Sequence, residues 1–166
     1  MILFATTPEQ KLKLAGFVHE MTKTDLDRKF LAAAYDLALK DQGVYDLFEL
    51  WAEADNDLEQ RDEIISDIQD LLDDNRDAPK QPVQKPYVKF DQLDDVTNHV
   101  MKDKATLRQI IDKHGGVSAV AKKTGIPQPS LSRMLNSASI PRRSTLYRIA
   151  NALDLPETEI AFEWTR

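Results

Sequence analysis

The chain has 166 residues, of which 42% are hydrophobic and 30% are charged, as in an ordinary globular protein. It has no cysteine, so disulfides and cysteine-ligated metals are excluded, and a reducing cytoplasm is expected. The first ten residues, MILFATTPEQ, lack the basic segment and the long apolar core of a signal peptide. The longest apolar run, residues 30–35, is far too short to span a bilayer, so we expect no membrane partner.

Charge is distributed unevenly along the sequence. Residues 1–78 carry 8 Lys/Arg against 19 Asp/Glu, whereas residues 102–153 carry 10 against 2. Residues 79–101 are balanced, with 3 of each, and residues 154–166 carry 1 against 4. An acidic half joined to a basic block indicates separate partners for the two halves.

The acidic half predicts a bundle of about four helices, and no stretch alternates well enough to be a strand. Thr7 and Pro8 are typical of a helix start, as cap and first residue. Thr24 or Asp25 is expected to cap a second helix, which Gly43 ends. The apolar residues expected on the two helices are Leu12, Ala15 and Val18, then Leu26, Phe30, Leu31, Ala34, Tyr35 and Ala38.

Two further helices complete this bundle. The third is short and carries Leu47, Leu50, Trp51 and Ala54. The fourth bears an apolar stripe at spacings of three and four, formed by Leu58, Ile64, Ile65, Ile68, Leu71 and Leu72. The stripe fits an intramolecular core better than a dimer seam, and both interpretations are kept.

Three prolines in DAPKQPVQKPYVKF, residues 77–90, predict an extended and semi-rigid spacer. The expected organisation is therefore an acidic bundle over 1–78 for oligomerisation or partner binding, a linker over 79–89, and a second helical domain over 90–166. In that domain a short helix with Phe90, Leu93, Val96 and Val100 is expected first. The next helices carry Leu107, Ile110 and Ile111; Val117, Val120 and Ala121; Leu131, Met134 and Leu135; and Leu146, Ile149, Ala150 and Leu153, with Leu155, Ile160 and Trp164 closing the core.

The stretch TGIPQPSLSRMLN, residues 124–136, is the most informative part of the sequence. Pro127 and Pro129 forbid a helix interior but are tolerated in a first turn, so a helix is expected to begin at about Gln128. Gly125 permits a left-handed turn before it, and Ile126 is expected to be buried. Two helices around a short glycine-containing turn are typical of a helix-turn-helix.

The sequence VAKKTGIPQPSLSRMLN, followed by Pro141 and STLYRIANALDL, resembles the helix-turn-helix domain of the Cro and phage-repressor (Xre) family. HGGVSAVAKKTG is similar to the branch that contains addiction-module antidote proteins. The resemblance covers roughly residues 104–156. It implies a five-helix domain that binds duplex DNA, usually as a dimer.

The resemblance also implies roles for residues at matching positions. Gln128, Pro129, Ser132 and Arg133 occupy base-facing positions, with Pro129 limited to apolar contact, and Ser130 and Asn136 occupy phosphate-facing positions. Where the family often has a phosphate-binding glutamine, this sequence has Val117, preceded by Gly116 as the expected cap.

Chemistry supports these assignments independently of the resemblance. Arginine pairs with guanine and glutamine with adenine through two hydrogen bonds each, which suits Arg133 and Gln128. The basic residues suited to phosphate contact are Lys122, Lys123, Arg142, Arg143 and Arg148, although Arg148 alone fits a solvated surface charge better.

Nothing in the sequence calls for catalysis, a cofactor or a metal. His19, His99 and His114 have no partner at ligand spacing, and His114 before Gly115 and Gly116 fits a helix end better than a ligand. The predicted protein is thus an all-α DNA-binding regulator, a homodimeric repressor at an operator. An antitoxin that neutralises a basic toxin and autoregulates its operon is the alternative. A third is an interaction module without DNA binding.

Overall fold

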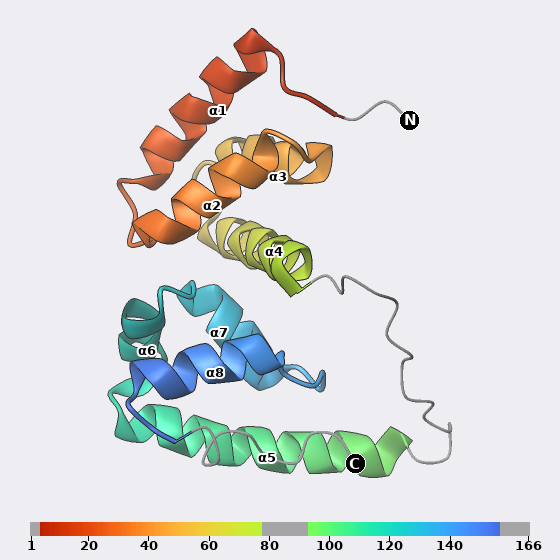
Figure 1. Ribbon diagram of the computed structural model, residues 1–166, viewed down its shortest axis with the longest axis vertical. Coiled ribbons are helices and arrows are strands. Elements are labelled where there is room, and N and C mark those ends of the chain that lie inside the picture. The colour runs from red at the N-terminus through yellow and green to blue at the C-terminus, as the bar shows by residue number, and fades with distance from the viewer. Residues whose placement is uncertain (1–3, 78–92, 157–166) are drawn as a thin grey trace. The chain divides into compact units, whose positions relative to one another are not determined.

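The computed structural model describes residues 4–77 and 93–156, which form eight helices, α1 to α8, and no strand within those ranges (Figure 1). The fold class is all-α, as the sequence predicts. The chain divides into two compact units, one of residues 1–76 with 125–130, the other of residues 77–124 with 131–166. The expected linker over 79–89, the position of Phe90, and the closing residues Ile160 and Trp164 lie outside the described residues.

The first helix, α1 (Pro8–Met21), begins where the sequence predicts. Thr7 accepts a hydrogen bond from the Gln10 backbone N–H at 3.2 Å, and the Gln10 side chain accepts one from the Thr7 N–H at 2.8 Å. This reciprocal capping box satisfies two backbone donors at the helix start. The predicted apolar face is wrong in part, because Leu12 and Ala15 are exposed. Leu14 and Met21 are buried instead, and Phe17 and Val18 are partly buried against the core of the bundle.

The boundaries of the next two helices also correct the expectation. Asp27 caps α2 (Arg28–Ala38), with its carboxylate accepting from the N–H groups of Lys29 and Phe30, so neither Thr24 nor Asp25 is the cap. Thr24 donates to the carbonyl of Met21 and closes the preceding turn. Gly43 does not end α2, because it lies in the first turn of α3 (Gln42–Glu53), which Asp41 caps.

The fourth helix, α4 (Leu58–Asp77), starts behind Asp57, whose carboxylate accepts from the Gln60 N–H at 3.0 Å. Its apolar stripe belongs to the core of the bundle: Ile64, Ile65, Ile68 and Leu72 are buried, whereas Leu58 is 73% exposed. Within the same helix the Gln69 amide donates to Asp73 at 2.9 Å, and Arg76 lies 3.6 Å from Asp73. The stripe therefore serves the intramolecular core, and most of it is not available as a dimer seam.

The core of the acidic bundle is mostly aliphatic and includes four aromatic side chains, those of Phe30, Tyr45, Phe48 and Trp51. Phe48 and Val44 are fully buried, and Tyr45 and Trp51 nearly so. α1 packs against α2 and α3, and α2 packs against α3. The guanidinium of Arg61 lies 4.0 Å from the centre of the Trp51 ring and its Nε donates to the Trp51 carbonyl, so a charged side chain covers the ring.

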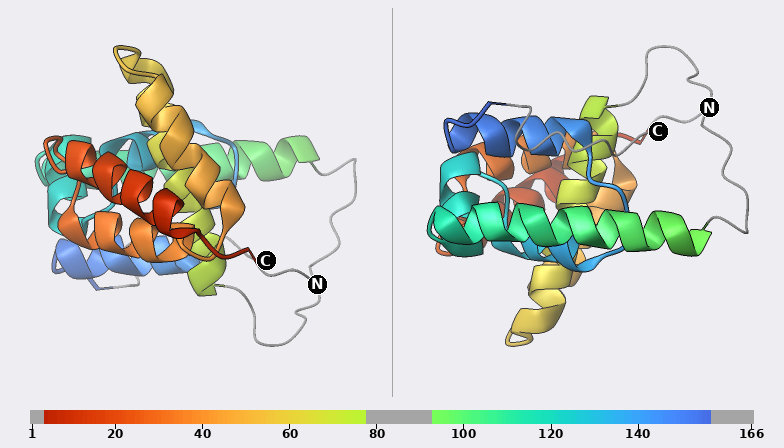
Figure 2. Two further views of the ribbon diagram at one scale, coloured as in Figure 1. Left: turned by 90° about the horizontal axis from the view of Figure 1, so that it is seen from above. Right: turned by 90° about the horizontal axis from the view of Figure 1, so that it is seen from below.

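The second unit is built on one long helix, α5 (Leu93–Lys113), where the sequence predicted two separate helices. No glycine or proline interrupts residues 93–113, and one continuous helix satisfies the backbone without a break. Figure 2 shows the first turns of α5 projecting past α6, α7 and α8. The buried side of α5 consists of Val100, Lys104, Leu107 and Ile111.

Three shorter helices follow: α6 (Gly116–Thr124), α7 (Gln128–Asn136) and α8 (Arg143–Ala152). α6 packs against both α5 and α8. Gly115 has φ +103°, and a Cβ there would lie 2.9 Å from the Cβ of Ala119, so the tight end of α5 requires glycine. The domain thus has four helices in its described part, and residues 157–166 lie outside it.

Candidate nucleic-acid interface

The predicted helix-turn-helix is formed by α6, a three-residue turn and α7. The turn runs from Gly125 to Pro127, and Gly125 has the left-handed φ of +72° that the sequence predicts. α7 begins at Gln128, which confirms the boundary predicted from the two prolines. Ile126, Leu131 and Leu135 are buried, so the apolar side of α7 is anchored and its other side is left for polar residues.

The candidate base-contacting residues lie in the first two turns of α7. Gln128 is exposed, and Pro129, Ser132 and Arg133 are half-buried. Ser130 has a buried hydroxyl oxygen that finds no hydrogen-bond partner among the described residues. The first turn of α7 contains no acidic residue, so no carboxylate of that turn neutralises the positive end of the helix dipole.

The basic candidates for phosphate contact flank α7 in the sequence, whereas Ser130 and Asn136 lie within it. Lys122 and Lys123 are exposed in the last turn of α6. Arg142 is the N-cap residue of α8 and makes no side-chain cap hydrogen bond, and Arg143 begins that helix with its guanidinium 5.8 Å from the ring centre of Tyr147. The N-terminal end of α8 therefore carries two guanidinium groups and no acidic residue in its first turn.

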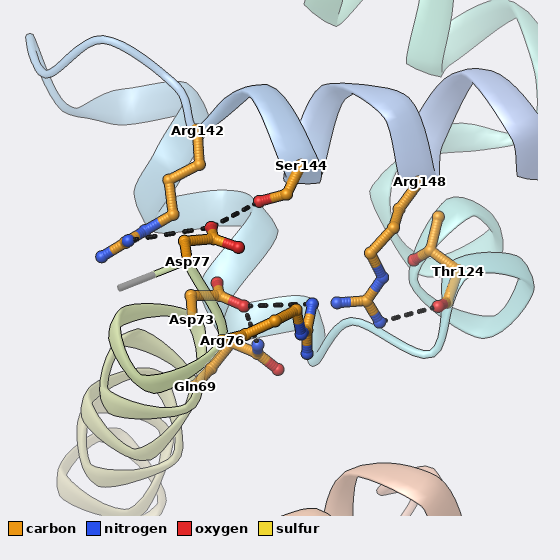
Figure 3. A network of polar contacts seen from close by, with 8 residues as sticks. All are labelled: Gln69, Asp73, Arg76, Asp77, Thr124, Arg142, Ser144 and Arg148. Atoms are coloured by element: carbon orange, nitrogen blue, oxygen red, sulfur yellow. Dashed lines mark hydrogen bonds and ion pairs between the residues drawn. The ribbon is translucent and has the colours of Figure 1, made fainter. Parts of the chain in front are cut away.

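A carboxylate already occupies part of this end of α8. Asp77, which groups with the second unit, accepts a hydrogen bond from the Ser144 hydroxyl at 2.6 Å and lies 4.0 Å from Arg142 (Figure 3). The side chains of Arg142 and Asp77 are 36% and 29% exposed, so solvent screens much of their attraction. An anion is thus accommodated at the place where phosphate contacts are expected.

Arg148 has a structural role that the sequence did not reveal. Its guanidinium donates to the carbonyl of Thr124, the last residue of α6, at 3.1 Å (Figure 3). The Thr124 hydroxyl in turn donates to the Val120 carbonyl at 2.8 Å. A cation at the C-terminal end of a helix satisfies carbonyl groups that lack partners and complements the helix dipole. Arg148 is therefore better described as a bond between α8 and the end of α6 than as a solvated charge.

Two basic side chains of α5 hold the other end of α7. Arg108 donates to the Asn136 side-chain oxygen at 2.6 Å. Lys104, only 1% exposed, donates to the Ser137 carbonyl and lies 3.3 Å from the Ser137 hydroxyl. Burial lowers the pKa of the Lys104 ammonium from its ordinary value. Sequence reasoning missed both residues, although the spacing of Lys104 from Leu107 and Ile111 places it in the apolar stripe.

His114 lies just after α5, and its Nδ1 is 2.8 Å from the Ile110 carbonyl, in agreement with the predicted helix end. In the described ranges, 4–77 and 93–156, no group of three or more His, Cys, Asp or Glu side chains is placed to hold a metal ion. Among the same residues, no helix has the length and apolar content needed to cross a membrane.

Comparison with protein families agrees with this geometry. Residues 107–160 match a family model described as helix-turn-helix, which covers α6, the turn, α7 and α8. Comparison of the chain with curated proteins and with solved structures gives no match.

The matched segment is a helix-turn-helix domain of the Cro and phage-repressor type, a class of DNA-binding domain found in transcription regulators. The match does not extend to the addiction-module branch, nor to the acidic bundle.

Proposed function

We propose that the protein represses transcription by binding a specific duplex-DNA operator. The observation that carries this proposal is the arrangement of α7: its apolar side is buried, and its first two turns present polar residues beside a basic block. In such domains the second helix of the motif enters the major groove with its N-terminal residues against base edges. A repressor needs no further activity, because occupancy of the operator is sufficient.

Base edges are read by Gln128, Ser132 and Arg133 in this proposal, with Pro129 in apolar contact. Arg133 suits guanine and Gln128 suits adenine, because each offers two hydrogen bonds in the matching geometry. Phosphates are held by Ser130, Asn136, Lys122, Lys123, Arg142 and Arg143. The Ser130 assignment rests on the family position alone, because its hydroxyl oxygen is buried in the structure.

The proposed regulator is a homodimer. One domain of this size contacts little DNA, and two half-sites about 34 Å apart are the usual requirement for specific binding. The acidic bundle is the proposed dimerisation unit, because Leu12, Leu50 and Leu58 leave apolar surface exposed on it and its negative charge disfavours contact with DNA. Sedimentation of the full-length protein should give a dimer, and a fragment of residues 87–166 should be mostly monomeric. A dimeric fragment would move the interface to the tail that contains Phe162 and Trp164.

The decisive experiment is selection of full-length protein on random duplexes, followed by a reporter assay with the selected site upstream of a gene. We expect an enriched palindromic sequence and a fall in reporter output. No enrichment at low salt would reject sequence-specific binding. Enrichment of a site together with increased reporter output would reject repression and leave sequence-specific binding supported.

An antitoxin is the second candidate, and the excess of acid in residues 1–78 favours it. A surface of that charge suits a basic protein partner. The test is affinity purification of full-length protein from its native host beside an Arg133→Ala variant. A small basic protein that both variants retain would support the antitoxin. A partner retained through DNA alone would be lost after nuclease treatment.

A further inference from the structure

The apolar side of α5 contains one residue that does not belong to a hydrophobic core. Val100, Leu107 and Ile111 are 4%, 0% and 0% exposed, and Lys104 between them is 1% exposed. A buried ammonium is costly unless it finds hydrogen-bond acceptors. A methionine or leucine there would fill similar space without that cost, so the charge calls for a specific explanation.

The acceptors of Lys104 belong to the end of the candidate recognition helix. Ser137 follows Asn136, the last residue of α7, and its N–H donates to the Arg133 carbonyl at 2.9 Å. Lys104 donates to the Ser137 carbonyl and reaches the Ser137 hydroxyl, which is also 2.7 Å from the Ser139 hydroxyl. The ammonium is therefore joined through one residue to the backbone of Arg133.

A second contact from α5 supports the same end of α7. Arg108, one turn after Lys104, donates to the Asn136 side chain at 2.6 Å. Two cations thus lie at the C-terminal end of α7, where carbonyl groups lack intrahelical partners and the helix dipole is negative. The two contacts fix α7 both along its axis and in rotation, because they attach to consecutive residues from one rigid helix.

We infer that Lys104 is a positioning residue, which holds α7 in the orientation that lets its side chains discriminate between base sequences. The inference rests on the proposed DNA-binding function. Base readout requires groups held within about 0.5 Å and 10–20° of the productive geometry. Non-specific binding has no such requirement, because it depends on the total charge near phosphates. Loss of Lys104 should therefore reduce discrimination more than it reduces general affinity.

The test uses full-length Lys104→Met, which keeps an unbranched side chain as far as the ε carbon and removes the ammonium. The matched control is Lys102→Met, which removes the same charge from an exposed position on the same helix. Affinity is measured by anisotropy for the selected site and for scrambled duplexes. Circular dichroism and thermal unfolding show whether each variant is folded.

The discrimination ratio is the affinity for the selected site divided by the affinity for scrambled duplexes. We expect Lys104→Met to lower this ratio about tenfold or more, because misplacing one good base contact already costs that much discrimination. Lys102→Met should lower both affinities slightly and leave the ratio unchanged. A folded Lys104→Met protein with the wild-type ratio would overturn the inference. Wild-type protein with no preference for any sequence would instead reject the proposed function.

A second variant keeps the inference testable if Lys104→Met does not fold. Ser137→Ala removes one of the two acceptors and leaves the Ser137 carbonyl in place. A smaller but measurable loss of discrimination, with unchanged binding to scrambled duplexes, supports the inference. An unchanged ratio in folded Ser137→Ala, beside an unfolded Lys104→Met, would assign Lys104 to stability alone and overturn it.

Discussion

The acidic bundle and the helix-turn-helix unit use charged residues in opposite ways. In the bundle, side-chain oxygens of Thr7, Asp27, Asp41 and Asp57 cap the four helix starts. Outside the bundle, α5 has Asp94 and Asp95 in its first turn, whereas α6, α7 and α8 have no acidic residue there, and the N-cap residue Arg142 makes no side-chain hydrogen bond to α8. Acids that satisfy helix ends stabilise the bundle and keep polyanions away. Their absence from the first turns of α6, α7 and α8 leaves positive helix ends, where phosphate groups can bind.

The largest expected effect tests the claim that the bundle depends on an apolar core. Phe48 is fully buried, so Phe48→Ala should lower the free energy of unfolding by about 3–5 kcal/mol through lost burial and a residual cavity. Leu12→Ala, at a side chain that is 76% exposed, should change it by about 0.5 kcal/mol or less. Urea unfolding followed by circular dichroism measures both. Similar losses of unfolding free energy in the two variants would contradict the claim that buried apolar side chains stabilise the bundle more than exposed ones.

The second prediction concerns the basic block. If about five phosphates are contacted, the log–log dependence of affinity on salt should have a slope of about −4 to −5. Binding should then weaken roughly 500-fold between 50 and 200 mM salt, since counterions released from DNA oppose it at higher concentration. Anisotropy titrations across that range provide the slope. An affinity that does not depend on salt would contradict the claim that the basic block binds DNA through phosphate contacts.

The third prediction separates base contacts from phosphate contacts within the second unit. Arg133→Ala should cost about 1–3 kcal/mol of discrimination between the selected site and scrambled duplexes. Arg142→Ala should weaken binding to all duplexes about equally, because the N-terminal end of α8 is expected to reach only the DNA backbone. If Arg133→Ala lowers both affinities equally, Arg133 contacts phosphate and its assignment to a base edge is wrong.

The comparison also shows which features are readable from local sequence. Pro127 and Pro129 restrict the backbone by themselves, so the start of α7 at Gln128 was predictable. The cap of α2 was not, because Thr24, Asp25 and Asp27 are all good capping residues within four positions, and tertiary packing decides among them. The continuity of α5 was missed because two apolar clusters were interpreted as two helices, although no residue between them breaks a helix.

Lys104 illustrates a different limit. Its partner Ser137 is 33 residues away in the sequence, and no local pattern links the two. A lysine within a basic block is normally interpreted as a surface charge, since lysine is almost never fully buried. The same reasoning misplaced Arg148, which is bonded to the end of α6. In this protein, basic residues divide into those expected to face phosphates and those that hold helices together, and only the three-dimensional contacts separate the two groups.

A smaller effect is expected at Asp77, a carboxylate that lies among the candidate phosphate contacts at the start of α8. Asp77→Asn removes the charge facing Arg142 and Ser144, so DNA affinity should rise by about 1.5- to 5-fold, the range of a solvent-screened ion pair. Asp112→Asn, at an exposed position on α5, is the control for the change in net charge. An equal gain in both variants would mean that Asp77 acts only through total charge and not at Arg142.

The last prediction uses pH to test the buried ammonium. Burial lowers the pKa of Lys104 in the folded state, so the unfolded chain binds more protons between that lowered pKa and the ordinary value of 10.5. The free energy of unfolding attributable to Lys104 should therefore increase as pH rises through this window and remain constant above it. Burial raises the pKa of Tyr45 and adds the opposite trend, which both proteins share when wild type is compared with Lys104→Met. As pH rises through the window, the free energy of unfolding of the wild-type protein should therefore increase relative to that of Lys104→Met. A difference that stays constant from neutral pH to about pH 10 would mean that the folded and unfolded states bind the Lys104 proton equally, which is incompatible with a desolvated ammonium beneath α7.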